Sequence, residues 1–378
     1  MEVPFAKPYL RGDEGAAVAE VIASGWVSQG PRVREFEAAF AARVDAADAV
    51  ATTNCTTALQ LALYVEGVRP GDEVVVPSMS FIATANAVWQ NGATPVFADI
   101  DPRTYNVDAD TIRPLITSRT KAIMPVHQLG LPVDMDPVLE LAAEHGLAVV
   151  EDAACAIGAS YKGRKIGSLG PLACYSFHPR KVITTGEGGM IAVQDPEVAA
   201  RLRRLRQHGM DVSDLARHGA KDIVFESYPE RGWNHRMTDM QAALGLCQLE
   251  LLDEIREERR RLAARYTDAL ERVPFVEPPY DPEYADRTWQ TYAISLTPDA
   301  PVTATELMRL LLKDGVTTRR GVMASHRELS YADTSAQLPN TDYAGRYSVM
   351  IPLFVGMTDE QQDYVIGSLA EHLAAVPV

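Results

Sequence analysis

The spacing of apolar residues changes near residue 49. Before it, apolar side chains recur at helical intervals on both sides of the turn-rich segment 24–31, which predicts two helices within residues 13–45. These spaced residues are Val18, Val21 and Ile22, then Val33, Phe36 and Phe40. After it, short apolar runs alternate with longer amphipathic stretches, which we interpret as strands alternating with helices. The strands are expected at 49–52, 73–77, 94–100, 121–127, 147–152, 174–177 and 189–193.

Helices between these strands are expected at 57–65 and 136–146, among others. Strands that alternate with helices are typical of an α/β fold with a mostly parallel sheet. Because helices then cover both faces of the sheet, we expect three layers.

The last third of the chain has a different pattern. Residues 238–271 predict one long helix, and we interpret its arginine-rich stretch at 256–261 as a solvated face. Shorter strands and helices follow, and an amphipathic helix is expected near 358–374. We therefore predict a large domain of residues 1–245 that includes an N-terminal arm, and a smaller α+β domain of residues 246–378.

Composition and charge narrow the functional classes. A length of 378 residues suits two domains, and 47% hydrophobic with 23% charged residues is ordinary for a globular protein. The formal net charge of −15 disfavours nucleic acid as a partner, although a local pocket can still attract a small anion. Neither a membrane span nor a secretory signal is expected. Four scattered cysteines form no CxxC pair, so we expect a cytoplasmic protein with no metal site: Cys55, Cys155, Cys174 and Cys247.

The residues after two predicted strands suggest covalent chemistry. Asp152 ends the apolar run LAVVED, at the strand end where ligands bind in α/β sheets, although a solvated acid would look the same. Lys181 follows Ser176 by five residues and precedes the glycine-rich turn 186–189. A lysine amine in such a place can form a Schiff base with an aldehyde cofactor such as pyridoxal 5'-phosphate (PLP). The Asp152 carboxylate would keep the ring nitrogen of PLP protonated.

PLP also needs a phosphate site and a flat contact for its ring. The stretch 51–63 runs from a short strand into a helix, and a helix N-terminus binds phosphate through its N–H groups and its dipole. The hydroxyls of Thr56 and Thr57 would add donors there, although they could simply cap the helix. Phe81 is the candidate for stacking on the ring, although a single Phe is commonly part of the core.

Seven ordered motifs over nearly the whole chain resemble the StrS/DegT family, the nucleotide-sugar aminotransferase branch of the fold-type I PLP enzymes. The motifs are NCTTAL, PSMSFIATANAV, PVFADIDPRTYNVD, MPVHQLGLPVDMD, VVEDAACAIGA, SFHPRKVITTGEGGM and GWNHRMTDMQAALGLCQL. The resemblance implies an aspartate-aminotransferase-like large domain and a cofactor that alternates between PLP and its amine form, PMP.

The resemblance also implies a role for individual residues. Lys181 matches the Schiff-base lysine, Asp152 the partner of the ring nitrogen, and Phe81 the aromatic contact of the ring. The phosphate ligands match Thr56, Thr57 and Ser176. Asn234 matches an asparagine that reaches the phosphate of the neighbouring subunit, which implies a homodimer with shared active sites.

The chain departs from the family at two positions. Cys55 stands where the family often has Gly, and Cys155 where it often has a Gln that touches the ring hydroxyl of the cofactor. A thiol is a weaker hydrogen-bonding group than an amide, so Cys155 puts that contact in doubt. A related branch of dehydratases has His in place of the lysine, and Lys181 argues against that branch.

The resemblance implies transfer of an amino group from L-glutamate to a nucleotide-linked keto-deoxysugar. The string KVITTGEGG is most similar to members that aminate C4, so we expect a 4-keto-6-deoxyhexose. Alternatives are amination at C3, amination of a keto-cyclitol of the scyllo-inosose type, and a non-catalytic regulator with this fold. For the sugar we expect contacts from Glu187, Arg319 and His326.

Overall fold

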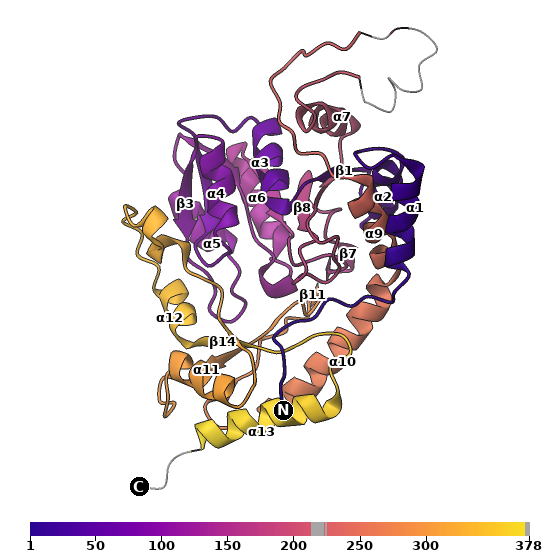
Figure 1. The fold of residues 1–378 in the computed structure, drawn as a ribbon. Coiled ribbons are helices and arrows are strands. Elements are labelled where there is room, and N and C mark those ends of the chain that lie inside the picture. The colour runs from indigo at the N-terminus through magenta and orange to yellow at the C-terminus, as the bar shows by residue number, and fades with distance from the viewer. Residues whose placement is uncertain (213–222, 224, 375–378) are drawn as a thin grey trace.

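A seven-stranded sheet lies at the centre of the computed structural model, which describes residues 1–212, 223 and 225–374 (Figure 1). Its order is β1-β9-β8-β5-β4-β2-β3, and the described pairings within it are parallel except those of β9 with β1 and β8. The strands are β1 (Asp48–Thr52), β2 (Glu73–Pro77), β3 (Thr94–Ala98), β4 (Thr120–Ile123), β5 (Ala148–Asp152), β8 (Leu172–Ser176) and β9 (Gly189–Val193). The predicted α/β class and mostly parallel sheet are confirmed. The chain returns from β8 to β9 through a loop without a crossover helix, which makes β9 antiparallel.

Helices cover both faces of this sheet. Alternate strand residues enter two different cores; Val75 lies in one, and Val74 and Val76 in the other. The first core also takes side chains from α2, α6 and α9, and the second from α3, α4 and α7. The predicted three layers are therefore present. The helices of this part are α1 (Glu14–Ser24), α2 (Pro31–Arg43), α3 (Cys55–Val65), α4 (Ala83–Gln90), α5 (Ala109–Ile112), α6 (Met135–His145), α7 (Pro196–Leu205) and α9 (Asp239–Glu250).

A second, antiparallel sheet has the order β10-β12-β14-β13 and packs with helices into a third core. Its elements are α10 (Leu252–Leu270), β10 (Val276–Glu277), β12 (Tyr292–Leu296), α11 (Ala304–Lys313), β13 (Arg319–Arg320), α12 (Pro339–Tyr347), β14 (Ser348–Ile351) and α13 (Asp359–Leu373). Val3 joins this core, and its backbone bonds to Gly315 and Thr317. A short sheet contains β6 (Ser160–Tyr161), β7 (Arg164–Lys165) and β11 (Ala285–Asp286). The domain boundary predicted after residue 245 falls within α9.

The prediction of one continuous helix over residues 238–271 was wrong. The chain forms α9 and α10, which meet at the buried Leu251. The reason is packing, because α9 lies against α1 and α2 while α10 runs away toward α13 (Figure 1). Apolar periodicity continues through the junction, so the pattern alone does not reveal the turn. A capping box of Thr238 and Gln241 starts α9.

The arginine-rich stretch 256–261 is only partly the solvated face that we expected. Arg256 and Arg260 pair with Asp286. Arg259 is buried and donates to the carbonyl oxygens of Trp289 and Gln290, and burial lowers its pKa to about 10. Among the described helices, none has the length and apolar composition that crossing a membrane requires.

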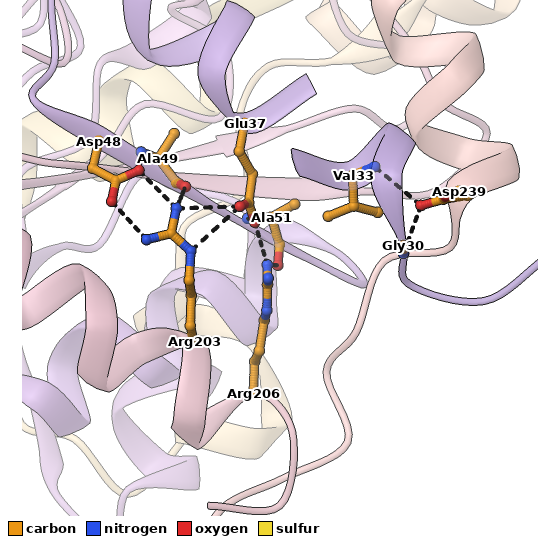
Figure 2. A network of polar contacts seen from close by, with 9 residues as sticks. All are labelled: Gly30, Val33, Glu37, Asp48, Ala49, Ala51, Arg203, Arg206 and Asp239. Carbon is orange, nitrogen blue, oxygen red and sulfur yellow. Dashed lines mark hydrogen bonds and ion pairs between the residues drawn. The ribbon is translucent and has the colours of Figure 1, made fainter. Parts of the chain in front are cut away.

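A buried ionic network fixes the start of the sheet to two helices (Figure 2). Glu37 on α2 accepts hydrogen bonds from Arg206 and Arg203 and from the Ala51 N–H of β1. Arg206 also donates to the Ala51 carbonyl oxygen at 2.6 Å. Since β1 leads directly into α3, this network sets the position of the α3 N-terminus.

Candidate active site

A cavity of about 560 Å³ opens where the carboxyl ends of β5 and β8 meet the N-terminus of α3. This is the edge of an α/β sheet at which ligands bind. Seven residues predicted for the site line it: Thr56, Thr57, Phe81, Asp152, Ser176, Lys181 and Glu187. They come from distant parts of the sequence, so the fold gathers the predicted groups into one place.

Asp152 ends β5 with both carboxylate oxygens held. Its Oδ1 accepts the Ala154 N–H at 3.1 Å, and its Oδ2 accepts the Thr84 hydroxyl at 2.8 Å. The side chain is almost fully buried. Burial raises the pKa of Asp152, whereas these two donors and the nearby Lys181 oppose that rise.

Lys181 lies in the loop between β8 and β9, and its Nζ donates to Cys155 Sγ at 3.1 Å. Burial lowers the pKa of the Lys181 ammonium, but Cys155, Asp152 and Cys55 raise it, and the net direction is upward. The backbone of Cys155 is fixed in turn, since its carbonyl oxygen accepts the Thr288 hydroxyl at 2.8 Å. Cys155 therefore faces the lysine amine in the structure.

The N-terminus of α3 has the geometry of a phosphate site. The Asn54 side chain caps the Thr57 N–H at 2.9 Å, and the Asn54 carbonyl oxygen accepts the Ala58 N–H. Within the described residues, this leaves the N–H groups of Cys55 and Thr56 for a ligand. The backbone of β9 passes so close that a Cβ on Gly189 would lie 2.7 Å from the Cys55 nitrogen. A glycine is therefore required at position 189, and the backbone of β9 packs directly against this phosphate cradle, residues 54–57 at the N-terminus of α3.

Cys155 contacts Lys181 but does not line the cavity, and three other predicted site residues lie elsewhere. Asn234 is exposed, and its backbone segment is held between α7 and Thr53. Arg319 is exposed on β13, 5.7 Å from the ring of Phe5. His326 is buried; its Nδ1 lies 2.6 Å from the Ser78 hydroxyl, and its Nε2 lies 3.3 Å from Asp342 without forming a hydrogen bond. None of the three lines the cavity of the described chain.

Sequence reasoning did not identify five polar residues that line the cavity, namely Asn54, Thr84, Gln90, His178 and Arg180. Thr84 on α4 bonds to Asp152, and His178 lies between Ser176 and Lys181 in the same loop. Burial lowers the pKa of His178. His178 could have been noticed from its position inside the lysine motif. Thr84 could not, because a threonine in an amphipathic helix carries no signal that distinguishes it.

The donors and charges of the cavity fit PLP. Its phosphate fits the free N–H groups of Cys55 and Thr56 and the Thr56 hydroxyl, whereas the Thr57 hydroxyl donates to the Asn54 carbonyl oxygen at 2.8 Å. Its ring nitrogen fits a buried carboxylate. Its aldehyde fits the lysine amine that lines the same cavity. The fold and this arrangement define a PLP-dependent transferase of the aminotransferase class.

Comparison with known proteins gives the family. The DegT/DnrJ/EryC1/StrS aminotransferase family matches residues 8–370. The chain is 41% identical over 374 residues to GDP-perosamine synthase of Caulobacter vibrioides, covering 98% of each protein. It is 37% identical over 376 residues to the spore coat polysaccharide biosynthesis protein SpsC of Bacillus subtilis, covering 98% of this chain and 96% of SpsC. The chain belongs to this family, whose members are PLP-dependent sugar aminotransferases.

Solved structures agree with this assignment. DesV of S. venezuelae matches with a TM-score of 0.90 and 35% identity, over all of both chains. The PMP form of the sugar aminotransferase Spr1654 of Streptococcus pneumoniae matches with a TM-score of 0.92 and 26% identity, over 98% of each chain. The predicted family, fold class and enzyme class are confirmed.

Proposed function

We propose that this enzyme transfers an amino group from L-glutamate to C4 of a nucleotide-linked 4-keto-6-deoxyhexose. The observation that carries the proposal is the convergence of Lys181, Asp152 and the α3 N-terminus on one cavity. Similarity to a GDP-perosamine synthase supports a nucleotide-linked sugar as substrate. The string KVITTGEGG, which begins at Lys181, supports amination at C4 rather than at C3 of the sugar.

Each cavity residue has a role in this proposal. When bound, PLP supplies an aldehyde that carries the amino group and a ring that accepts electrons. Lys181 is the covalent anchor, and its Nζ moves the proton during transfer. Asp152 would keep a proton on the ring nitrogen. Thr56, Thr57 and Ser176 would hold the phosphate, Phe81 would contact the ring, and Cys155 would take the place of the residue that bonds to the ring hydroxyl.

The proposal also includes a partner subunit and substrate contacts. We propose a cytoplasmic homodimer in which Asn234 completes the phosphate site of the neighbouring subunit. Glu187 is the strongest candidate for a sugar contact, because its exposed side chain lines the cavity. Arg319 and His326 remain proposed contacts from the second part of the chain.

The direct test is a panel of nucleotide-linked 4-keto and 3-keto sugars and a keto-cyclitol, with L-glutamate as donor. We expect mass spectrometry to show amination of a 4-keto-6-deoxyhexose at the highest kcat/KM. Preference for a 3-keto sugar or the cyclitol would overturn the C4 assignment, and no amination of any acceptor would overturn the proposal. In the same assay, Glu187→Gln should slow the half-reaction with the sugar and spare that with glutamate, since only the first involves the sugar.

A further inference from the structure

The Asp152 carboxylate is attached to a short chain of hydroxyl groups. Thr84 Oγ1 lies 2.8 Å from Asp152 Oδ2, and Ser80 Oγ lies 2.7 Å from Thr84 Oγ1. All three side chains are buried, with Thr84 only 1% exposed. Thr84 also lines the cavity beside Asp152. The carboxylate is thus held by a hydroxyl group that is itself hydrogen-bonded to a second hydroxyl.

The direction of these hydrogen bonds follows from the chemistry of the groups. An ionised carboxylate only accepts, so the Thr84 hydroxyl must donate its proton to Asp152. The oxygen of Thr84 is then left as an acceptor, and Ser80 must donate to it. Aligned donors of this kind polarise one another, so the Ser80 bond strengthens the Thr84 bond. Both hydroxyl groups therefore donate their protons in the direction of the negative charge of Asp152.

We infer that Thr84 is a positioning residue that, with Ser80 behind it, keeps Asp152 ionised and aimed at the ring nitrogen of the cofactor. This inference rests on the proposed function, in which Asp152 is the partner of that nitrogen. Burial alone favours a neutral carboxyl group, and a neutral Asp152 could not balance a protonated ring. Thr84 and the Ala154 N–H provide the hydrogen bonds that oppose this effect.

Other charged and titratable groups also act on Asp152. Lys181 in the loop after β8 favours its negative charge, whereas the thiols of Cys55 on α3 and Cys174 on β8 are themselves held neutral near it. His127 after β4 also lies close, since its backbone N–H donates to the Asp152 carbonyl oxygen. His127 accepts the Val133 N–H at Nδ1, so its Nε2 carries the proton and donates to Glu151 at 2.9 Å. Of these groups, only Lys181 lies in the cavity as a cation.

The support for Ser80 comes from a distant part of the chain. Segment 78–80 follows β2 and pairs with residues 323–326, where the Ser80 N–H donates to the Met323 carbonyl oxygen at 3.2 Å. The Ser325 N–H donates to the Ser78 carbonyl oxygen at 2.7 Å. His326 bonds to Ser78 from the same segment. The hydroxyl chain is therefore fixed at its outer end as well as at Asp152.

The test follows the proton on the cofactor. The full-length enzyme is loaded with PLP carrying ¹⁵N at the ring nitrogen, and the ¹⁵N chemical shift reports whether that nitrogen is protonated. In Thr84→Val we expect the signal to move toward the value of the unprotonated ring, because a carboxylate without its donor takes the shared proton. Thr84→Ser should restore the wild-type signal, and Ser80→Ala should give a smaller change in the same direction. The kcat of the glutamate half-reaction should fall about tenfold in Thr84→Val with little change in KM, as expected for loss of a hydrogen bond to a charged group.

A matched control is available in Thr341. It is also fully buried, and its hydroxyl donates to a carboxylate, that of Asp99, at 2.7 Å. Thr341→Val should lose stability as Thr84→Val does, yet leave the ¹⁵N signal and kcat unchanged. A wild-type signal in folded Thr84→Val, or a Thr84→Ser variant that behaves like Thr84→Val, would overturn the inference. Asp152→Asn distinguishes a failure of this inference from a failure of the proposed function. An unchanged ¹⁵N signal in that variant would show that Asp152 is not the partner of the ring nitrogen.

Discussion

At the scale of the residue, the cavity combines burial with opposing charges. Burial lowers the pKa of the Lys181 ammonium, but Cys155 and Asp152 raise it, and the net direction is upward. The amine therefore has a nearby acceptor and a nearby carboxylate, which suits a group that must hold a proton and release it. Cys155 is the unusual member of this set, because a thiol, a weak acceptor, stands where the family often has an amide.

Replacing the lysine tests the covalent role. Lys181→Ala should reduce transamination by several orders of magnitude, because both the anchor and the proton carrier are lost. The fold should persist, since the side-chain hydrogen bond of Lys181 goes to Cys155 alone within the described residues. Turnover and thermal melting measure the two effects. Lys181→Arg is the control, because it keeps a cation in the pocket and should be equally inactive. Substantial turnover in either variant would contradict the assignment.

At the scale of the element, the phosphate cradle depends on how β1 is anchored. Glu37 on α2 and Arg206 after α7 are both almost fully buried, and both bond to Ala51 one residue before the end of β1. Asp239 at the start of α9 also binds backbone N–H groups of Gly30 and Val33 (Figure 2). These contacts tie α2 and the end of α7 to the strand that leads into α3, and tie α9 to the start of α2.

The anchor predicts a large stability effect. Arg206→Met should lower the free energy of unfolding by about 3–5 kcal/mol, because Glu37 would remain buried without its main partner. Arg203→Met should cost less, since Arg203 is one-third exposed and Glu37 keeps Arg206. Chemical denaturation measures both. The double variant Glu37→Met with Arg206→Met should recover part of the lost free energy of unfolding. If Arg206→Met alone lost no more than Arg203→Met, the anchoring role of Arg206 would be contradicted.

The elements also show which features the sequence predicts. The seven strands follow from short apolar runs, and the positions of Asp152 and Lys181 follow from strand ends and motifs. The break at Leu251 does not, because it depends on which core each helix meets. The hydrogen bonds of Thr84 and His326 were equally out of reach of pattern reasoning, although His326 itself was named as a candidate sugar contact. Their roles depend on contacts with residues far away in the sequence, Asp152 and Ser78 respectively.

At the scale of the whole molecule, the position of Asn234 bears on the proposed homodimer. Asn234 faces outward from a well-held segment, where the His235 carbonyl oxygen accepts the Thr53 N–H at 3.0 Å. The same segment thus contacts the edge of its own cradle and presents Asn234 to solvent. An outward-facing Asn234 on a well-held segment is what the proposed homodimer requires, because there it would reach the site of a second copy of the chain.

Complementation between two inactive variants tests this arrangement. In Asn234→Asp a carboxylate would repel the phosphate, so both this variant and Lys181→Ala should be inactive as homodimers. In a heterodimer, one site has both substitutions, while the other keeps Lys181 from one subunit and Asn234 from its partner. After random mixing of equal amounts, about a quarter of the wild-type activity should appear, because half of the dimers are mixed and each has one intact site. Sedimentation should show a dimer, and native mass spectrometry should confirm subunit exchange. An active monomer, or exchanged heterodimers without recovered activity, would show that each chain builds its site alone.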